Sequence, residues 1–136
     1  MGRASFTPAP QGALIRVTAP SRGLSPRRHG AHLHMSASVP TRPGSSMPLG
    51  TPRRMRRILA MLCEHGPESD NLPNISVAAE DSACVDLFTS LMTMSELHDA
   101  DGSALVIRAQ SEDHVSQPIG NCGDRVDCAV ITSEGL

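Results

Sequence analysis

The chain has 136 residues, of which 12 are basic, 14 are acidic and four are cysteine, and its formal net charge is −2. It contains no tryptophan, no tyrosine and no lysine. Without lysine, every mechanism that needs a lysine amine is excluded, including the Walker A phosphate loop, the Schiff base of pyridoxal enzymes and protein-kinase catalysis.

The two ends of the chain carry charges of opposite sign. Residues 1–63 hold ten arginines and no acidic residue, which gives a charge of about +10. Residues 64–136 hold two arginines and all 14 acidic residues, which gives about −12. The boundary between Cys63 and Glu64 therefore separates a basic half from an acidic half.

Residues 1–50 have the composition of a disordered basic arm rich in proline, serine and arginine. Residues 1–57 contain 25 Pro, Gly, Ser and Thr residues, and no acidic residue accompanies the arginines. Such a segment buries too little apolar surface to offset the ordering of its backbone. Its prolines interrupt any helix that begins. We therefore expect the N-terminal half to be mostly disordered.

Three histidines lie close together in this arm, namely His29, His32 and His34. They could offer imidazoles to a metal, but gathering them in a flexible segment is entropically costly. No carboxylate lies nearby in the sequence to orient them. We expect adventitious metal binding here, with neither a dedicated metal site nor a cofactor.

Residues 51–66 carry the start and stop signals of a basic amphipathic helix. Thr51 is a suitable N-cap, Pro52 suits the first helical position, and Gly66 can adopt the left-handed conformation that ends a helix. The apolar residues recur at helical spacing, so they share one face. They are Met55, Ile58, Leu59 and Leu62.

Residues 67–136 are predicted to form a small acidic α/β or α+β unit of marginal stability. We expect short strands over 75–78, 104–107 and 126–131. Between the first two strands, a helix from residue 82 to about residue 98 follows from the spacing of four apolar residues. They are Cys84, Leu87, Phe88 and Leu91. A unit of this size buries a small fraction of its surface, which is why its stability is low.

The acidic half carries no motif that identifies a reaction. The segment 99–102 resembles part of a calcium loop, but Arg108 stands where the final glutamate ligand belongs. Cys122 and Cys128 are separated by five residues, which is unlike the closer spacing of zinc sites. We expect four free thiols and no catalytic residue.

We interpret the chain as a small non-enzymatic protein that binds an anionic partner through its arm and helix. The partner would be an acidic protein, a nucleic acid or a membrane surface. The side chains expected to bind it are Arg27, Arg28, Arg53, Arg54, Arg56 and Arg57.

Two other interpretations stay open. One is a soluble domain sent to an organelle by a removable transit peptide, and the other is a spurious or mis-started reading frame with no selected function. No run of about 18 apolar residues exists to span a membrane. We expect an intracellular rather than a secreted protein, and a homo-oligomer is compatible with the sequence.

Overall fold

The computed structural model describes residues 3–19, 24–34, 61–62, 64, 71–79, 82–97, 103–116 and 120–131. In this part of the chain, strands predominate and the one helix has four residues. In chain order the elements are β1 (Arg3–Ala9), β2 (Gly12–Ala19), β3 (Arg28–His34), β4 (Asn71–Ser76), β5 (Ala83–Thr89), α1 (Met94–Leu97), β6 (Ser103–Arg108) and β7 (Arg125–Ile131).

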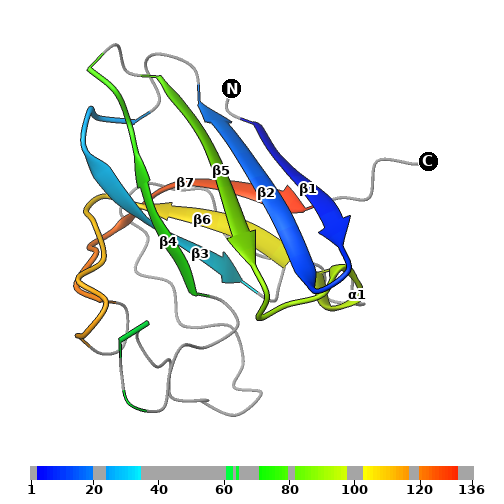
Figure 1. Ribbon diagram of the computed structural model, residues 1–136. Coiled ribbons are helices and arrows are strands. Elements are labelled where there is room, and N and C mark those ends of the chain that lie inside the picture. Colours follow the sequence, from blue (N-terminus) through cyan, green and yellow to red (C-terminus); the bar gives the residue numbers. More distant parts are fainter. Residues whose placement is uncertain are drawn as a thin grey trace.

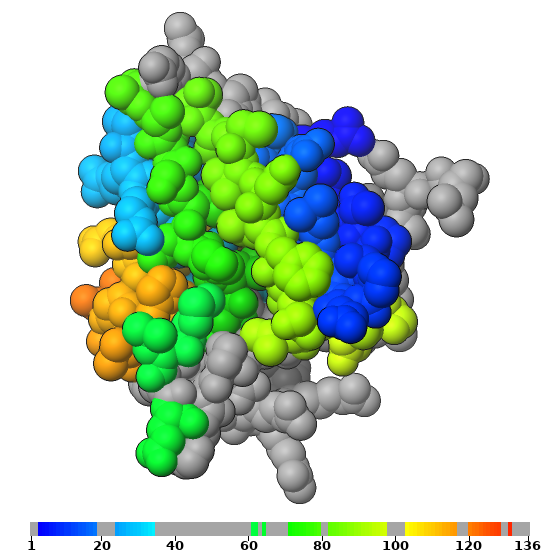
Figure 2. Space-filling model, viewed as in Figure 1, coloured from blue at the N-terminus to red at the C-terminus, as the bar shows by residue number. Residues whose placement is uncertain are grey.

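The strands form two antiparallel sheets that face each other as the layers of a β-sandwich (Figure 1). The first sheet has the order β1-β2-β5, and the second has the order β4-β3-β6-β7. All of the strand pairs are antiparallel. The neighbouring edge strands β4 and β5 run side by side along one side of the molecule (Figure 2).

Alternation along the strands explains how the first sheet buries one face. In β2, Ala13, Ile15 and Val17 are buried, whereas the side chains between them point outward. On the outer face, Arg16 makes a two-pronged ion pair with Asp86 of β5, with Nε–Oδ1 and Nη2–Oδ2 distances of 2.7 and 2.8 Å. The inward face packs on the second sheet.

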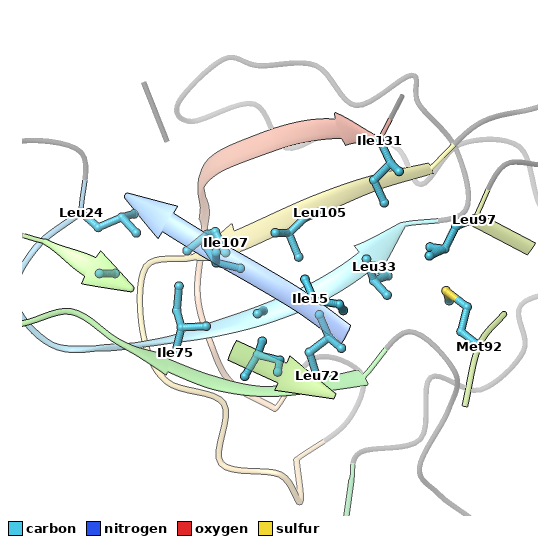
Figure 3. Close-up of a cluster of buried hydrophobic side chains, with 14 of the residues drawn as sticks. Ile15, Leu24, Leu33, Leu72, Ile75, Met92, Leu97, Leu105, Ile107 and Ile131 are labelled. Carbon is cyan, nitrogen blue, oxygen red and sulfur yellow. The ribbon is translucent and has the colours of Figure 1, made fainter. Parts of the chain in front are cut away.

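The space between the sheets is filled by aliphatic side chains from both layers (Figure 3). Aromatic residues contribute little, since Phe6 is the one that packs at the margin of this core. The labelled members are Ile15, Leu24, Leu33, Leu72, Ile75, Met92, Leu97, Leu105, Ile107 and Ile131.

Strand β3 is buried on both of its faces. Ala31 and Leu33 belong to the core between the sheets. The alternate residues Gly30 and His32 point away from that core, yet they are buried too. The outer face of the second sheet must therefore be covered by another part of the chain.

The expected disordered N-terminal half is wrong, because β1, β2 and β3 all lie within it. The expected separate α/β unit is also wrong, since each sheet combines strands from the basic and the acidic halves. The composition of this segment predicts disorder because it takes no account of strands from elsewhere in the chain that pack on it. Here Ile15 and Leu33 are buried by strands that come from far along the chain.

The helix expected from residue 82 to 98 is wrong, because its first half forms the strand β5 and only residues 94–97 form the short helix α1. Its residues also alternate with a period of two, since Ala83, Leu87 and Thr89 are buried and Phe88 is exposed. A short apolar pattern is compatible with the period of a helix and with that of a strand. Antiparallel pairing with β2 makes this segment a strand.

The other expected elements agree with the structure to different extents. The strands expected over 104–107 and 126–131 are confirmed as β6 and β7, and β4 overlaps the strand expected over 75–78. Of the helix expected over 51–66, the structure describes residues 61, 62 and 64, and the segment 99–102 lies outside the described residues. In the described ranges, no helix is long and apolar enough to cross a membrane.

Substituting Ile15 by Ala should destabilise the protein by about 2 to 5 kcal/mol, because it leaves a cavity in the core. Ile15 is fully buried, so its neighbours can collapse only partly into the space. Urea unfolding measures the loss. Arg16→Gln, which changes the exposed neighbour, serves as the control and should alter stability little. Equal losses in the two variants would contradict the assigned core.

Candidate functional site

The outer face of β3 is covered by the connection between β6 and β7. We call residues 109–116 and 120–124 of this connection the covering loop. The amide of Gly30 donates to the carbonyl oxygen of Gln110 at 2.8 Å. A Cβ added to Gly30 would lie 3.1 Å from the Cβ of Cys122. The loop therefore packs directly on β3, with little room for a larger residue at position 30.

Asn74 of β4 attaches the covering loop to the second sheet. Its Nδ2 donates to the carbonyl oxygen of Glu112 at 2.9 Å, and its Oδ1 accepts from the Glu112 amide at 2.7 Å. Nδ2 also lies 3.1 Å from Nε2 of His114. These two hydrogen bonds to the backbone of Glu112 fix the position from which the Glu112 side chain extends.

His29 joins the beginning of β3 to the end of β6. Its Nδ1 lies 2.6 Å from the carbonyl oxygen of Arg108, and its Nε2 lies 2.9 Å from that of Ser25. The ring is almost wholly buried. Both ring nitrogens thus face backbone acceptors, so His29 is occupied by structural contacts and is not available as a ligand.

His32 lies at the centre of a buried polar cluster. Its Nε2 is 3.5 Å from Oε2 of Glu112 and 3.6 Å from Sγ of Cys122. On the far side of Glu112, Nδ1 of His114 lies 3.9 Å from the same Oε2. An imidazole, a carboxylate and a thiol from β3 and the covering loop therefore meet beneath that loop.

His34 follows His32 at a distance of two residues on the same strand, so both side chains point to the outer face of β3. Burial lowers the pKa of both imidazoles to about 4. The charge of Arg108 lowers the pKa of both further, and the charge of Arg125 acts on that of His34. Both rings are therefore neutral at neutral pH, and the contact of His32 with Glu112 is then not an ion pair.

Arg108 places a positive charge at this cluster. Its side chain is 8% exposed, and its Nη1 donates to the carbonyl oxygen of Gly123 at 3.2 Å. No described atom accepts a hydrogen bond from its buried Nε. Burial lowers the pKa of Arg108, but the guanidinium stays charged because arginine is not deprotonated in proteins.

The structure places the sequence-predicted residues differently from the expectation. Arg27 and Arg28 are exposed residues beside the start of β3, and their contacts do not test partner binding. Arg53, Arg54, Arg56 and Arg57 lie outside the described residues.

A metal site at His32 and His34 is not expected from the sequence, because the composition predicts that both residues lie in a flexible arm. The arm forms a strand here, and this removes the entropic objection to gathering the two rings. The spacing of two residues was the signal available in the sequence, because in a strand it puts both side chains on one face. Cys84 and Cys128 are free thiols, the sulfur of Cys122 contacts the imidazole of His32, and Cys63 lies outside the described residues.

Comparison with known proteins gives one consistent family. The family model for copper/zinc superoxide dismutase (SODC) matches residues 1–131. A Cu-Zn superoxide dismutase of Caulobacter vibrioides is 33% identical over 136 residues, covering 96% of this chain and 77% of that protein. One from Deinococcus radiodurans is 29% identical, covering 95% and 75%.

Solved structures share the sandwich. A SOD-like protein from Bacillus subtilis aligns with a TM-score of 0.74 at 24% identity, covering 96% of this chain and 89% of that one. The Cu/Zn superoxide dismutase from Brucella abortus aligns with a TM-score of 0.70 at 19% identity, covering 96% and 88%. At these identities the likeness concerns the fold.

These comparisons correct the expectation of a non-enzymatic protein that binds an anionic partner. The matched family is one of oxidoreductases, and the match extends through both the basic and the acidic halves. The separation of charge suggested an arm and a domain. In the structure the halves pair with each other, as Arg16 of β2 does with Asp86 of β5.

The family name implies copper and zinc, and the donor atoms of this chain can be tested against each metal. Neutral imidazoles such as those of His32 and His34 suit copper. A structural zinc site requires four ligands in a tetrahedron. Among the described residues, no group of three or more His, Cys, Asp or Glu side chains is placed to hold a metal. The imidazole pair therefore fits copper in donor chemistry, and this part of the chain completes no zinc site.

Substituting Gly120 by Ala should destabilise the protein more than Gly123→Ala does. Both glycines have positive φ, +58° and +73°, so each alanine brings backbone strain of about 1 kcal/mol. At Gly120 the added Cβ would also overlap the side chain of Glu112, whereas at Gly123 the nearest atom lies at 3.7 Å. Urea unfolding of both variants checks this. Equal losses would show that Glu112 is not held as described.

The metal-free protein should lose stability as the pH falls from about 6.5 to about 4. In this window the unfolded chain binds protons at His32 and His34, with the ordinary pKa of 6.5, whereas the folded chain holds both rings neutral. Urea unfolding at several pH values measures the slope. Changing both residues to Gln should flatten it, and an unchanged slope would contradict the burial of the neutral rings.

Proposed function

Because the chain belongs to the copper/zinc superoxide dismutase family, we propose that it is an oxidoreductase that dismutates superoxide at a copper ion held by His32 and His34. The observation that carries this proposal is the pair of neutral imidazoles on the outer face of β3. A neutral imidazole can bind a metal without first losing a proton. The relatives from Caulobacter vibrioides and Deinococcus radiodurans, of which this chain spans 77% and 75%, are named as superoxide dismutases.

A bound copper ion supplies one-electron chemistry, so that one superoxide is oxidised to dioxygen and a second, with two protons, is reduced to hydrogen peroxide. The residues of this chain contribute position and charge. Strand β3 holds both rings, and Asn74 holds the loop that covers them. Superoxide is an anion, so the guanidinium groups of Arg108 and Arg125 attract it toward the imidazoles.

The double variant His32→Gln, His34→Gln should lose stoichiometric copper binding, and its superoxide dismutation should fall to that of free buffer. The reason is that both nitrogen ligands are removed while glutamine keeps a polar side chain at each position. Elemental analysis after dialysis and a superoxide-consumption assay measure the two effects.

Cys84→Ser is the matched control, because it removes an exposed thiol on the outer face of the first sheet, away from His32 and His34. It should leave both readouts unchanged. Copper retained by the His double variant, but lost from the Cys84 variant, would overturn the proposal.

A second candidate function is a copper-holding protein without dismutase activity. The observation that favours it is the buried charge of Arg108 beside the imidazoles, since a fixed cation disfavours the divalent state of copper, which one-electron cycling requires. The same experiment separates the two candidates. Copper held by His32 and His34 without superoxide consumption would support the second.

A further inference from the structure

Cys122 brings a sulfur atom to the outer face of β3, beside the imidazole of His32. Its Sγ lies 3.6 Å from Nε2 of His32, and both side chains are buried. The contact joins residues that are 90 positions apart in the chain. The covering loop therefore brings a thiol to a ring that the proposed function already assigns to copper.

The backbone on both sides of Cys122 turns its side chain inward. Asn121 and Gly123 adopt left-handed conformations, with φ values of 56° and 73°, and both are exposed, whereas Cys122 is fully buried. The carbonyl oxygen of Cys122 accepts a hydrogen bond from the amide of Gln110 at 3.0 Å. The turn on either side and this hydrogen bond therefore hold Cys122 toward β3.

Gly30 leaves the space that Cys122 occupies against β3. A Cβ added at Gly30 would lie 3.1 Å from Cβ and 3.5 Å from Sγ of Cys122. The sulfur therefore lies directly over the backbone of Gly30, and His32 follows two residues later on the same face. Packing against the strand thus keeps the thiol close to the ring.

The distance between the nitrogen and the sulfur suits two ligands of a single metal ion. In zinc proteins, the bonds to a histidine nitrogen and a cysteine sulfur are about 2.0 and about 2.3 Å long. At a tetrahedral angle, two such bonds place their donor atoms about 3.5 Å apart. The separation of Nε2 of His32 from Sγ of Cys122 is 3.6 Å. An ion can therefore take the place of the thiol proton with little movement of either side chain.

The donor atoms are ones that copper accepts. Soft sulfur ligands and imidazoles both bind copper, and two histidines with one cysteine form the trigonal sites of copper electron-transfer proteins. His32, His34 and Cys122 supply two imidazoles and one sulfur. In the described part of the metal-free chain, no three such side chains are placed to hold a metal. The contact between His32 and Cys122 is therefore the part of the site that exists before metal binds.

We propose that Cys122 is a copper ligand that binds through its sulfur to the same ion as His32. On binding, the sulfur–hydrogen bond breaks, the proton passes to the solvent and a sulfur–copper bond forms, without transfer of electrons. The inference rests on the proposed function, because it takes His32 and His34 as ligands. It goes further by adding a sulfur donor from the covering loop, which makes that loop a part of the metal site.

The test is X-ray absorption at the copper edge, because it distinguishes a sulfur ligand from nitrogen or oxygen ligands. The full chain is loaded with one equivalent of Cu⁺ without oxygen. The wild-type chain should show one sulfur ligand at about 2.3 Å. Cys122→Ser should show nitrogen and oxygen ligands alone. By competition with a Cu⁺ chelator, its affinity should fall at least tenfold, since loss of a residue that only supports a ligand already costs tenfold or more.

Three single variants are matched controls, because each replaces one of the other thiols by the same hydroxyl group. They are Cys63→Ser, Cys84→Ser and Cys128→Ser. All three should keep the sulfur ligand and the wild-type affinity for Cu⁺. A sulfur ligand that persists in Cys122→Ser, or that is lost in one of the controls, would overturn the inference.

The wild-type chain decides the question even if Cys122→Ser does not fold. Copper held there by nitrogen and oxygen ligands alone would overturn the inference and leave the proposed function standing. Copper held in the double variant His32→Gln, His34→Gln as tightly as in the wild-type chain would overturn both. A wild-type chain that binds no copper would also overturn both.

Discussion

The burial of β3 on both faces is the constraint on which the rest of the structure depends. One face, with Ala31 and Leu33, packs in the core between the sheets. The other face, with Gly30 and His32, is sealed by the covering loop. A strand between two such surfaces has one register, because a shift of one residue would exchange the aliphatic and imidazole faces. The fold and the candidate site are therefore specified by the same seven residues.

The covering loop is held by polar contacts with the backbone. Asn74 binds both the amide and the carbonyl group of Glu112, and Gly120 leaves the space that the Glu112 side chain occupies. His29 binds the carbonyl oxygen of Arg108, where the loop begins. The residues that make these contacts come from β4, from the covering loop and from β3. They convert a surface connection into a fixed lid over the imidazoles, and they do so without a disulfide between the described cysteines.

The cluster beneath this lid combines metal-binding donors with a charge that opposes metals. His32 and His34 are kept neutral by burial, which prepares them as ligands. Arg108 is buried with them and remains charged. A site that only held a divalent metal would gain from a neutral residue at this position. Under the proposed function, the guanidinium is explained by an anionic substrate, since superoxide carries a negative charge.

The sequence by itself determined the local patterns. The strands at residues 104–107 and 126–131 were predictable from their apolar runs, and the absence of lysine excluded whole classes of enzyme. The tertiary structure decided what those patterns meant. Residues 1–50 are poor in apolar side chains, and β2 and β3 form there because partners from the acidic half bury Ile15 and Leu33. The site could not be predicted for the same reason: His32 meets Glu112 and Cys122 across 80 and 90 positions of the chain, and only long-range strand pairing brings such residues together.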